Sequence, residues 1–392
     1  MSTSLKYILA VICFLVLGNL YYAQPIISDI APDVGIELSG SGIIVTVTQI
    51  GYCLGVLFLV PLGDVVENRR LLSLLVWGAM VALVAAGLSH HQLSFLSSVF
   101  FVGLFSCSMQ VIIPLSAGLA GDQERGRVLG LIISGGLLGI VLSRPTASLL
   151  TGLGSWRFTY FYAAGLMVVV GLLIRKMPRR APVADALSYP AILSSMVRLF
   201  ISVPGIKRYL GAMALIFMTF TLFWATVPIV LQDVLHFSHT DIAIFSLISL
   251  AAPPCALMAG KMIDRGKGFL LTLISISMVF CAFIATPVLG MYLFAFMLAA
   301  LLLEPGVHMT NVVIQQAVIA FVPEARSRLN ALCIAFTFTG GAVGSWLGPW
   351  LYSHYGWKLT VAIAGVTVLA ALTLNVSLRV MPAKQISMPE NT

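Results

Sequence analysis

Charged side chains are scarce in this sequence of 392 residues. Asp, Glu, Lys and Arg make up only 9% of it, against 59% hydrophobic residues, and the mean hydropathy is +1.03. Soluble domains carry about 25% charged residues, so the composition excludes a soluble domain of ordinary type. The six cysteines lie inside apolar stretches without CxxC spacing. We therefore expect free thiols rather than a disulfide framework or a thiolate metal site.

Enzyme motifs are absent as well. The sequence has no Gly-rich phosphate loop with its Lys, no closely spaced His or Cys metal set and no hydrolase elbow. We expect neither an enzyme nor a bound cofactor or metal. Without a nucleotide site the chain cannot drive pumping with ATP, so any uphill movement must use an ion gradient.

Long apolar runs dominate what is present. A membrane-spanning helix needs about 20 mostly apolar residues, and twelve stretches are long enough. The sequence therefore predicts an all-α membrane protein with twelve transmembrane helices. The predicted crossings are 6–27, 41–63, 71–89, 93–119, 128–152, 157–175, 208–232, 240–263, 268–287, 290–320, 329–352 and 357–379.

The second half of the sequence repeats landmarks of the first at offsets of 200 or 201 residues. Each landmark lies where an apolar stretch meets a short polar connection, so an ordered set of crossings is duplicated. We predict two six-helix bundles, 1–175 and 208–380, joined by a cytoplasmic linker, 176–207, and followed by a cytoplasmic tail, 381–392. The recurring pairs are Asp64 and Asp264, Arg125/Arg127 and Arg326/Arg328, and Trp156-Arg157 and Trp357-Lys358.

The net charge is +8, and the distribution of the positive residues agrees with the predicted topology. With a cytoplasmic N-terminus, all but three of the 22 Lys and Arg residues fall on cytoplasmic segments. Arg157 and Lys358 fall outside, and Arg144 falls within the membrane. This positive-inside pattern places both termini in the cytoplasm. The charge then indicates contact with anionic lipid headgroups rather than nucleic acid, and the middle of the linker, 187–201, is a candidate surface helix.

Glu304 and Arg144 are the ionisable groups placed well inside apolar stretches. Glu304 lies near the middle of the tenth crossing, and His308, Asn311 and Gln315 follow it at spacings of four, three and four residues, which places all of them on one helical face. We expect this face to line a cavity, with Pro305-Gly306 interrupting the helix beside it. Glu304 would load and release a proton, assisted by His308. The alternative is a neutral or salt-bridged structural carboxylate.

The role of Arg144 stays open at this point. It could bind an anionic substrate, pair with Glu304 or extend to the membrane interface. Uncharged polar or aromatic residues in other crossings are further candidates for the cavity, although such residues are as often contacts between helices. These candidates are Asn19, Tyr22, Gln24, Gln49, Gln110 and Trp224.

The loops after the second and eighth crossings resemble those of the major facilitator superfamily. The family pattern is Gly-x-x-x-Asp-Arg-x-Gly-Arg-Arg; the first loop keeps the Asp and, shifted by one position, the arginine pair, and the second loop matches Gly260 to Arg265 better. The resemblance implies the major facilitator fold and a polar latch on the cytoplasmic side. The implied latch residues are Asp64, Arg69, Arg70, Asp264 and Arg265.

Within that family the chain is most similar to twelve-helix bacterial drug/proton antiporters and sugar or metabolite exporters. Gly135-x-x-x-Gly139 follows their fifth-helix pattern, although Ile140 replaces its proline. The resemblance implies export of a small organic solute across the bacterial inner membrane in exchange for protons, by alternating access. The candidates for the cavity are mostly apolar or amide-bearing, which suits a neutral or amphipathic solute, and we expect a monomer. Two alternatives remain: a proton symporter or facilitator that imports a nutrient, and a receptor or scaffold without transport activity.

Overall fold

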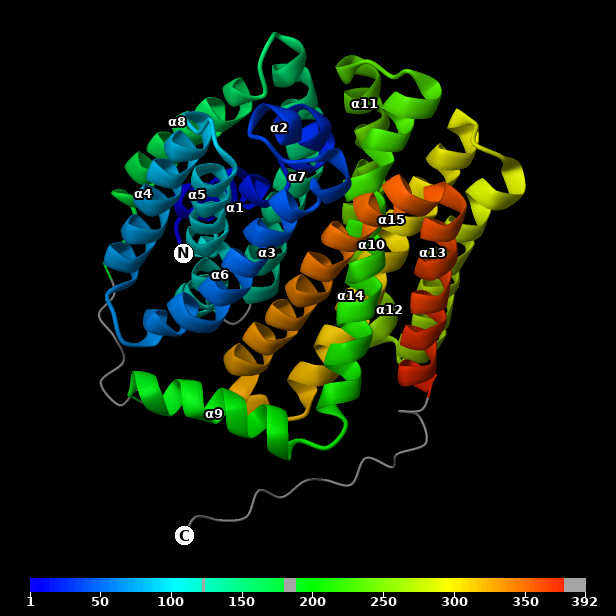
Figure 1. Cartoon of the computed structure of the whole chain (residues 1–392). Coiled ribbons are helices and arrows are strands. Elements are labelled where there is room, and N and C mark those ends of the chain that lie inside the picture. Colours follow the sequence, from blue (N-terminus) through cyan, green and yellow to red (C-terminus); the bar gives the residue numbers. More distant parts are fainter. Residues whose placement is uncertain (122–123, 180–187, 377–392) are drawn as a thin grey trace.

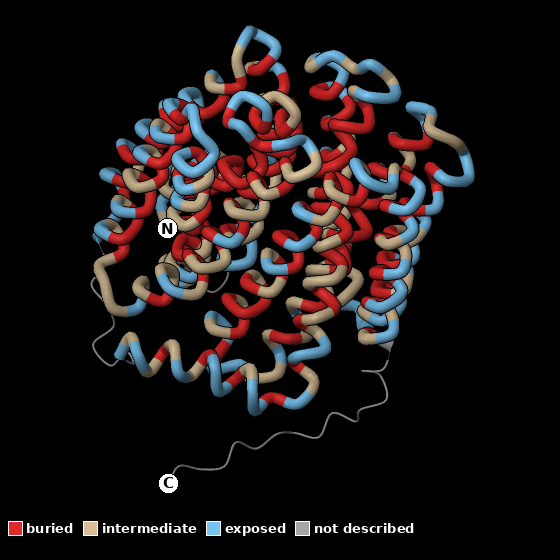
Figure 2. Tube along the Cα trace, viewed as in Figure 1, coloured by how far each residue is buried: buried red, intermediate tan, exposed pale blue. Residues whose placement is uncertain are grey.

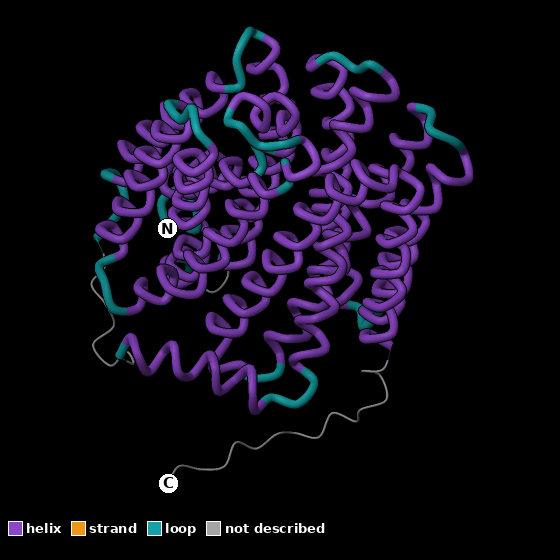
Figure 3. Tube along the Cα trace, viewed as in Figure 1, coloured by secondary structure: helices purple, strands orange, loops and turns teal. Residues whose placement is uncertain are grey.

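The computed structural model describes residues 1–121, 124–179 and 188–376. All regular secondary structure in these ranges is helical (Figure 3). The predicted tail, 381–392, and part of the predicted linker, 180–187, lie outside the described residues.

The first half contains eight α-helices, several joined or extended by short 3₁₀ turns. The first crossing is composite, because 3₁₀ turns Gly18–Leu20 and Gln24–Ile26 join two of the helices. The helices are α1 (Thr3–Leu17), α2 (Ile27–Asp33), α3 (Ile43–Leu54), α4 (Asn68–Gly87), α5 (Gln92–Phe105), α6 (Ser108–Leu119), α7 (Arg125–Gly152) and α8 (Arg157–Ile174).

The second half begins with a helix in the predicted linker and continues through the remaining crossings. A 3₁₀ segment, Leu247–Ala251, joins two helices of the eighth crossing. The helices are α9 (Tyr189–Ser202), α10 (Ile206–Leu235), α11 (His239–Ser246), α12 (Ala252–Asp264), α13 (Gly268–Leu289), α14 (Leu293–Ala320) and α15 (Arg326–Val376).

The described chain has 11 helical segments long and apolar enough to span a membrane. The last of them, Pro323–Asn375, is 53 residues long and contains two of the twelve predicted crossings. Gly356 separates these two, with φ 76° and ψ 176°, a conformation that glycine adopts without the strain of a Cβ atom. The twelve-helix prediction is therefore confirmed, with the last two helices joined by a sharp kink.

Figure 1 shows α1 to α8 gathered on one side of the molecule and α10 to α15 on the other, with α9 crossing beneath them. Buried residues concentrate on the faces where helices meet, and exposed residues lie on the outer faces and the connections (Figure 2). This distribution places the core between the helices, so a polar residue in that core must find a partner there.

Glycines allow close helix packing at equivalent places in the two halves. A Cβ atom on Gly139 of α7 would lie 2.1 Å from the carbonyl oxygen of Phe14 in α1. A Cβ atom on Gly344 of α15 would lie 2.0 Å from the carbonyl oxygen of Met218 in α10. These two glycines therefore serve helix packing, as small residues commonly do in membranes.

The two largest interfaces between the halves in the described ranges are those of α3 with α15 and of α7 with α11. In the α3–α15 interface, the Thr46 hydroxyl lies 2.9 Å from the carbonyl oxygen of Ala342 and 3.0 Å from the Ser345 hydroxyl. In the α7–α11 interface, the Ser148 hydroxyl donates to the carbonyl oxygen of His239 at 2.7 Å. The candidate site lies beside this second interface, because one of its residues is on α7.

Candidate functional site

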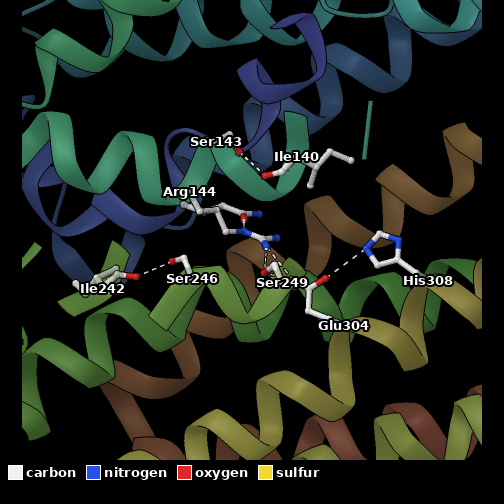
Figure 4. Close-up of polar contacts among 9 residues, drawn as sticks. Ile140, Ser143, Arg144, Ile242, Ser246, Ser249, Glu304 and His308 are labelled. Carbon is white, nitrogen blue, oxygen red and sulfur yellow. Dashed lines mark hydrogen bonds and ion pairs between the residues drawn. The ribbon is translucent and has the colours of Figure 1, made fainter. Parts of the chain in front are cut away.

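A buried ion pair connects the two halves near their centre. Nη1 of Arg144, on α7, lies 2.9 Å from Oε1 of Glu304, on α14, and each side chain is only 1% exposed. Figure 4 shows the two side chains pointing toward each other from their separate helices. Of the alternatives for Arg144, the structure contains the pairing with Glu304, and Arg144 does not extend to the membrane interface.

Two further crossings complete the hydrogen bonds of this pair. The Ser249 hydroxyl, in the 3₁₀ segment of the eighth crossing, accepts from Arg144 Nη1 at 2.8 Å and donates to Glu304 Oε1 at 2.7 Å. Gln24, in the first crossing, accepts from Arg144 Nε at 3.0 Å through its Oε1 atom. Four crossings therefore meet at one ion pair, two from each half.

His308 contacts the other oxygen of the carboxylate. Its Nε2 atom lies 3.4 Å from Glu304 Oε2, one helical turn away on α14, and its side chain is 14% exposed. The two oxygens of Glu304 thus have different partners: Oε1 faces Arg144 and Ser249, and Oε2 faces His308 (Figure 4). His308 is the more exposed member of the cluster.

Aromatic rings surround the guanidinium group. The Arg144 Cζ atom lies 4.0 Å from the ring centroid of Trp224, 5.3 Å from that of Phe220 and 5.6 Å from that of Tyr21. Ring faces attract cations, most strongly those of Trp. The rings therefore stabilise the charge of Arg144 while they exclude water from it.

The energetics of the pair follow from its burial. Removing a charged group from water costs several kcal/mol per ion, and attraction between the two ions offsets this only when hydrogen bonds satisfy the remaining polar atoms. Here Glu304 receives three partners and the formal charges of Arg144 and Glu304 cancel. The contact is consequently stable only while both charges are present.

Several buried polar atoms around the centre have no hydrogen-bond partner among the described residues. Such atoms are rare in folded proteins, and they usually mark a place for water or a ligand. They occur on both halves, on the first, second, fourth, fifth, seventh and tenth crossings. The central set comprises Asn19 Oδ1, Gln24 Nε2, Gln49 Oε1 and Nε2, Ser108 Oγ, Gln110 Oε1, Arg144 Nη2, Trp224 Nε1 and Asn311 Oδ1.

Only part of the predicted cavity set converges on the ion pair. Gln24 and Trp224 contact Arg144, and His308 contacts Glu304. No hydrogen bond or ion pair in the described ranges joins the remaining residues to this pair: three of their amides bond to other helices, and the Gln49 amide has no partner among the described residues.

The surroundings of those residues are as follows. Asn19 donates to Ser106 Oγ at 3.4 Å, Gln110 donates to the Tyr52 hydroxyl at 3.1 Å, and Gln315 donates to Asn330 Oδ1 at 2.6 Å. The Tyr22 hydroxyl lies against Gly18, the Gln49 amide lies against Gly341, and Asn311 is half-buried.

The expected interruption at Pro305-Gly306 is wrong. The helix α14 continues from Leu293 to Ala320 with both residues buried inside it. Proline removes one backbone donor but its fixed φ is close to the helical value, so packing on both sides keeps the helix intact. Gly306 has a packing role, because a Cβ atom there would lie 2.8 Å from the carbonyl oxygen of Ser275 in α13.

The predicted latch residues are distributed unevenly over the two loops. Asp64 is exposed and has no ion-pair partner within 4.0 Å among the described residues, although Arg328 of α15 lies near enough to attract its carboxylate. Arg70 pairs with Glu67 at 3.2 Å, and Arg179 reaches the same carboxylate at 3.8 Å. Sequence reasoning did not single out Glu67.

The other latch residues have weaker contacts. Arg69 is half-buried, and within the described ranges neither Arg69, Asp264 nor Arg265 has an ion-pair partner within 4.0 Å. On the same side, Lys6 bonds Glu124 at 2.8 Å, and this hydrogen bond holds the pKa of the Glu124 carboxyl below its ordinary value.

Ser249, Tyr21 and Phe220 belong to the site but were not predicted from the sequence. Serine is common in apolar helices, where it bonds to its own backbone, and aromatic residues fill most membrane cores. One signal exists for Ser249. It lies 201 residues after Thr48, a hydroxyl at the equivalent position of the second crossing.

Comparisons with known proteins agree with this architecture. The family model for the Major Facilitator Superfamily matches residues 9–309 and 212–391. The uncharacterized transporter YgaY of Escherichia coli O157:H7 is 33% identical over 375 residues, which cover 94% of this chain and 93% of that protein. The transporter SCO4007 of Streptomyces coelicolor is 27% identical over 367 residues, covering 91% and 83%.

Solved structures share the fold at low sequence identity. The nucleoside transporter NupG superposes with a TM-score of 0.77 at 14% identity, covering 95% of this chain and 99% of that one. A D-xylose-proton symporter gives 0.76 at 16% identity, covering 99% and 100%. The chain therefore belongs to the major facilitator superfamily. It is a multi-pass membrane protein and a secondary transporter of a small molecule, not an enzyme.

Proposed function

We propose that the chain couples the movement of a small organic solute to that of protons, with outward exchange as the direction of transport. Glu304 is the group that takes up the proton, and His308 is its relay. The observation that carries this proposal is the buried ion pair between Glu304 and Arg144, because it joins the two halves that must separate during alternating access.

Protonation supplies the coupling. A neutral Glu304 loses its charge attraction for Arg144, so the contact between the halves weakens when the proton arrives. A ligand shifts a conformational equilibrium by its difference in affinity for the two states, and the effect is reciprocal. Proton uptake at Glu304 and separation of the halves on this side of the site therefore favour each other.

Charge balance supports a second candidate, cotransport of the solute with a proton. Once Glu304 is neutral, Arg144 is a buried cation without its partner, and a solute that supplies negative charge restores the balance. Proton and solute then bind together rather than in turn. The import of a nutrient by symport, one of the alternatives drawn from the sequence, would use this order.

We also propose that the predicted orientation and latch hold for the folded chain. The two bundles, 1–175 and 208–380, rock as units with both termini in the cytoplasm of a bacterial cell and the protein monomeric in the inner membrane. Asp64 with Arg328, together with Glu67, Arg70 and Arg179, then lies on the cytoplasmic side. Of these groups, only Asp64 and Arg328 belong to different bundles, so theirs is the attraction that would weaken when that side opens.

Proteoliposomes loaded with a pH-sensitive dye test the coupling. Addition of organic solutes from a panel should move protons in vesicles with the wild-type chain, and Glu304→Gln should abolish that movement. Glu324→Gln, the same change at an exposed acid, is the matched control and should behave as wild type. Proton movement that persists in Glu304→Gln would remove Glu304 from the mechanism. Opposite or parallel flow of solute and protons separates exchange from cotransport.

A further inference from the structure

Three unpartnered groups beside the ion pair can only donate hydrogen bonds. They are Nη2 of Arg144, Nε1 of Trp224 and Nε2 of Gln24, and none has an acceptor in the part of the chain that the structure describes. Arginine and tryptophan have no acceptor atoms. The orientation of the Gln24 amide is fixed because its oxygen already accepts from Arg144.

These donors form one cluster. The Trp224 ring lies 4.0 Å from the guanidinium carbon, and the Gln24 amide oxygen lies 3.0 Å from Nε of the same group. The three side chains are no more than 1% exposed. An unpaired buried donor costs about 1–3 kcal/mol, so the cluster is arranged for a ligand that brings acceptors. A ligand rich in donors would leave all three groups unpaired.

The hydrogen bonds of Arg144 leave one nitrogen of its guanidinium group, Nη2, without a partner among the described residues. Glu304 and Ser249 both use Nη1, and Gln24 uses Nε, so Nη2 remains available. Guanidinium binds carboxylates best through two parallel hydrogen bonds. A second carboxylate can therefore contact Nη2, and it gains a further donor on Arg144 when Glu304 is protonated and releases Nη1.

We propose that the transported solute is a small organic carboxylate that binds Arg144, Trp224 and Gln24 and competes with Glu304 for the guanidinium group. This inference rests on the proposed proton coupling, in the form of the second candidate, cotransport, and adds the chemical class of the solute. The rings of Tyr21, Phe220 and Trp224 around Arg144 fit an apolar or aromatic body attached to the carboxylate. It replaces the neutral solute expected from the sequence.

The charge balance of the site predicts how carboxylate affinity depends on pH. With Glu304 ionised and the neighbouring His308 neutral, a bound carboxylate leaves the site with one uncompensated negative charge, whereas a proton on Glu304 or on His308 leaves it neutral. Carboxylate affinity should therefore rise as pH falls, and Glu304→Gln should bind carboxylates more tightly than wild type, by about tenfold at pH 8, which is about 1.4 kcal/mol.

The test uses the purified full-length chain in detergent and matched pairs of acid and amide. Benzoate with benzamide and butyrate with butyramide are each added at the same millimolar concentration, and thermal unfolding is followed. We expect the acids to raise Tm and the amides to leave it unchanged. Amides as effective as their acids, or acids without effect, would overturn the proposal. Phenyl phosphate and inorganic phosphate are added in parallel, and stabilisation by these alone would overturn the assignment of a carboxylate.

Trp224→Phe provides a variant that does not disturb the ion pair. It keeps a ring beside Arg144 but removes the donor, so carboxylate affinity should fall by about tenfold to a hundredfold, as expected for one hydrogen bond to a charged group. Trp346→Phe, at an exposed position of α15, is the control and should leave affinity unchanged. Unchanged affinity in Trp224→Phe would contradict the proposed donor cluster even if Glu304→Gln failed to fold.

These outcomes are independent of the proton assay. Loss of proton movement in Glu304→Gln combined with a preference for amides would reject the carboxylate and keep the proposed function. A clear preference for acids, lost in Trp224→Phe, combined with intact proton movement in Glu304→Gln would do the reverse.

Discussion

The two halves place very different residues at equivalent positions. The segment from α5 to α6, 92–119, corresponds to α14, 293–320, at an offset of 201 residues. At the same offset Glu304 corresponds to Gly103. The packing glycines Gly139 and Gly344 align α7 with α15 at an offset of 205, at which Arg144 corresponds to Pro349. Neither charged residue of the site therefore has a charged counterpart.

The regions that correspond to the site serve packing instead. Ser345 lies in the α3–α15 interface, where its hydroxyl is 3.0 Å from that of Thr46. A Cβ atom on Gly103 would lie only 1.9 Å from the carbonyl oxygen of Thr48, and Thr48 is in turn the counterpart of Ser249. The same geometry thus holds two helices together at one place and holds an ion pair at the other. The charged site is therefore confined to one of the two related interfaces, and we expect the other, between α3 and α15, to act as the pivot.

The strongest test of this asymmetry removes one charge. Arg144→Gln leaves Glu304 buried without its cation, so we expect a loss of about 3–5 kcal/mol in unfolding free energy and no transport. The double variant with Glu304→Gln should recover most of that stability without proton coupling, because neither charge remains unpaired. Denaturant unfolding in detergent measures both. The asymmetry would be contradicted if Arg144→Gln were as stable as wild type, and Ser345→Ala supplies the control in the α3–α15 interface.

A second test disturbs the pivot instead. A Cβ atom on Gly42 would lie 2.0 Å from the carbonyl oxygen of Ser345, so Gly42→Ala must push α15 away from the start of α3. Overpacking of this kind costs about 1–3 kcal/mol, and we expect slower transport as well. Gly40→Ala is the control, since nothing lies within 4 Å of a Cβ atom there. Equal stability and equal transport rates in the two variants would show that the close approach does not matter.

Much of this architecture could be predicted from the sequence. The apolar stretches predict helices because unpaired backbone groups are costly in lipid. The repeat then divides these helices into two halves. Arg144 and Glu304 were also identifiable because charges inside such helices are costly. Their pairing was one of several alternatives, since it depends on how two helices 160 positions apart in sequence are arranged.

The uncharged part of the site could not be predicted in the same way. Asn19, Gln110 and Gln315 look like Gln24 in sequence, yet they bond to neighbouring helices away from the ion pair. Which amide reaches the centre depends on helix rotation, which apolar residues on every side leave unspecified. Pro305 illustrates the opposite error, because tertiary packing kept a helix that local propensity predicted to break.

A third prediction compares single hydroxyl groups across the two interfaces. Ser249→Ala removes a group that bonds both members of the ion pair, and hydrogen bonds to charged groups are worth about 1.5–3 kcal/mol. Thr46→Val removes a hydroxyl that contacts neutral partners across the α3–α15 interface. Such bonds between membrane helices average about 0.6 kcal/mol. Unfolding of both variants in one detergent should rank Ser249→Ala as the more destabilised, and the reverse order would place the larger polar contribution at the pivot.

The smallest expected effect concerns the outer end of the interface that carries the site. Asp29 of α2 lies 3.3 Å from His239 Nε2 at the start of α11, and the two side chains are 28% and 27% exposed. This contact also joins the halves, but solvent screens it, and such pairs contribute about 0–1 kcal/mol. Asp29→Asn should therefore change stability by less than about 1 kcal/mol and preserve proton coupling. If it abolished coupling as Glu304→Gln is expected to do, the link between protons and conformation would lie at the rim of the interface rather than at its buried centre.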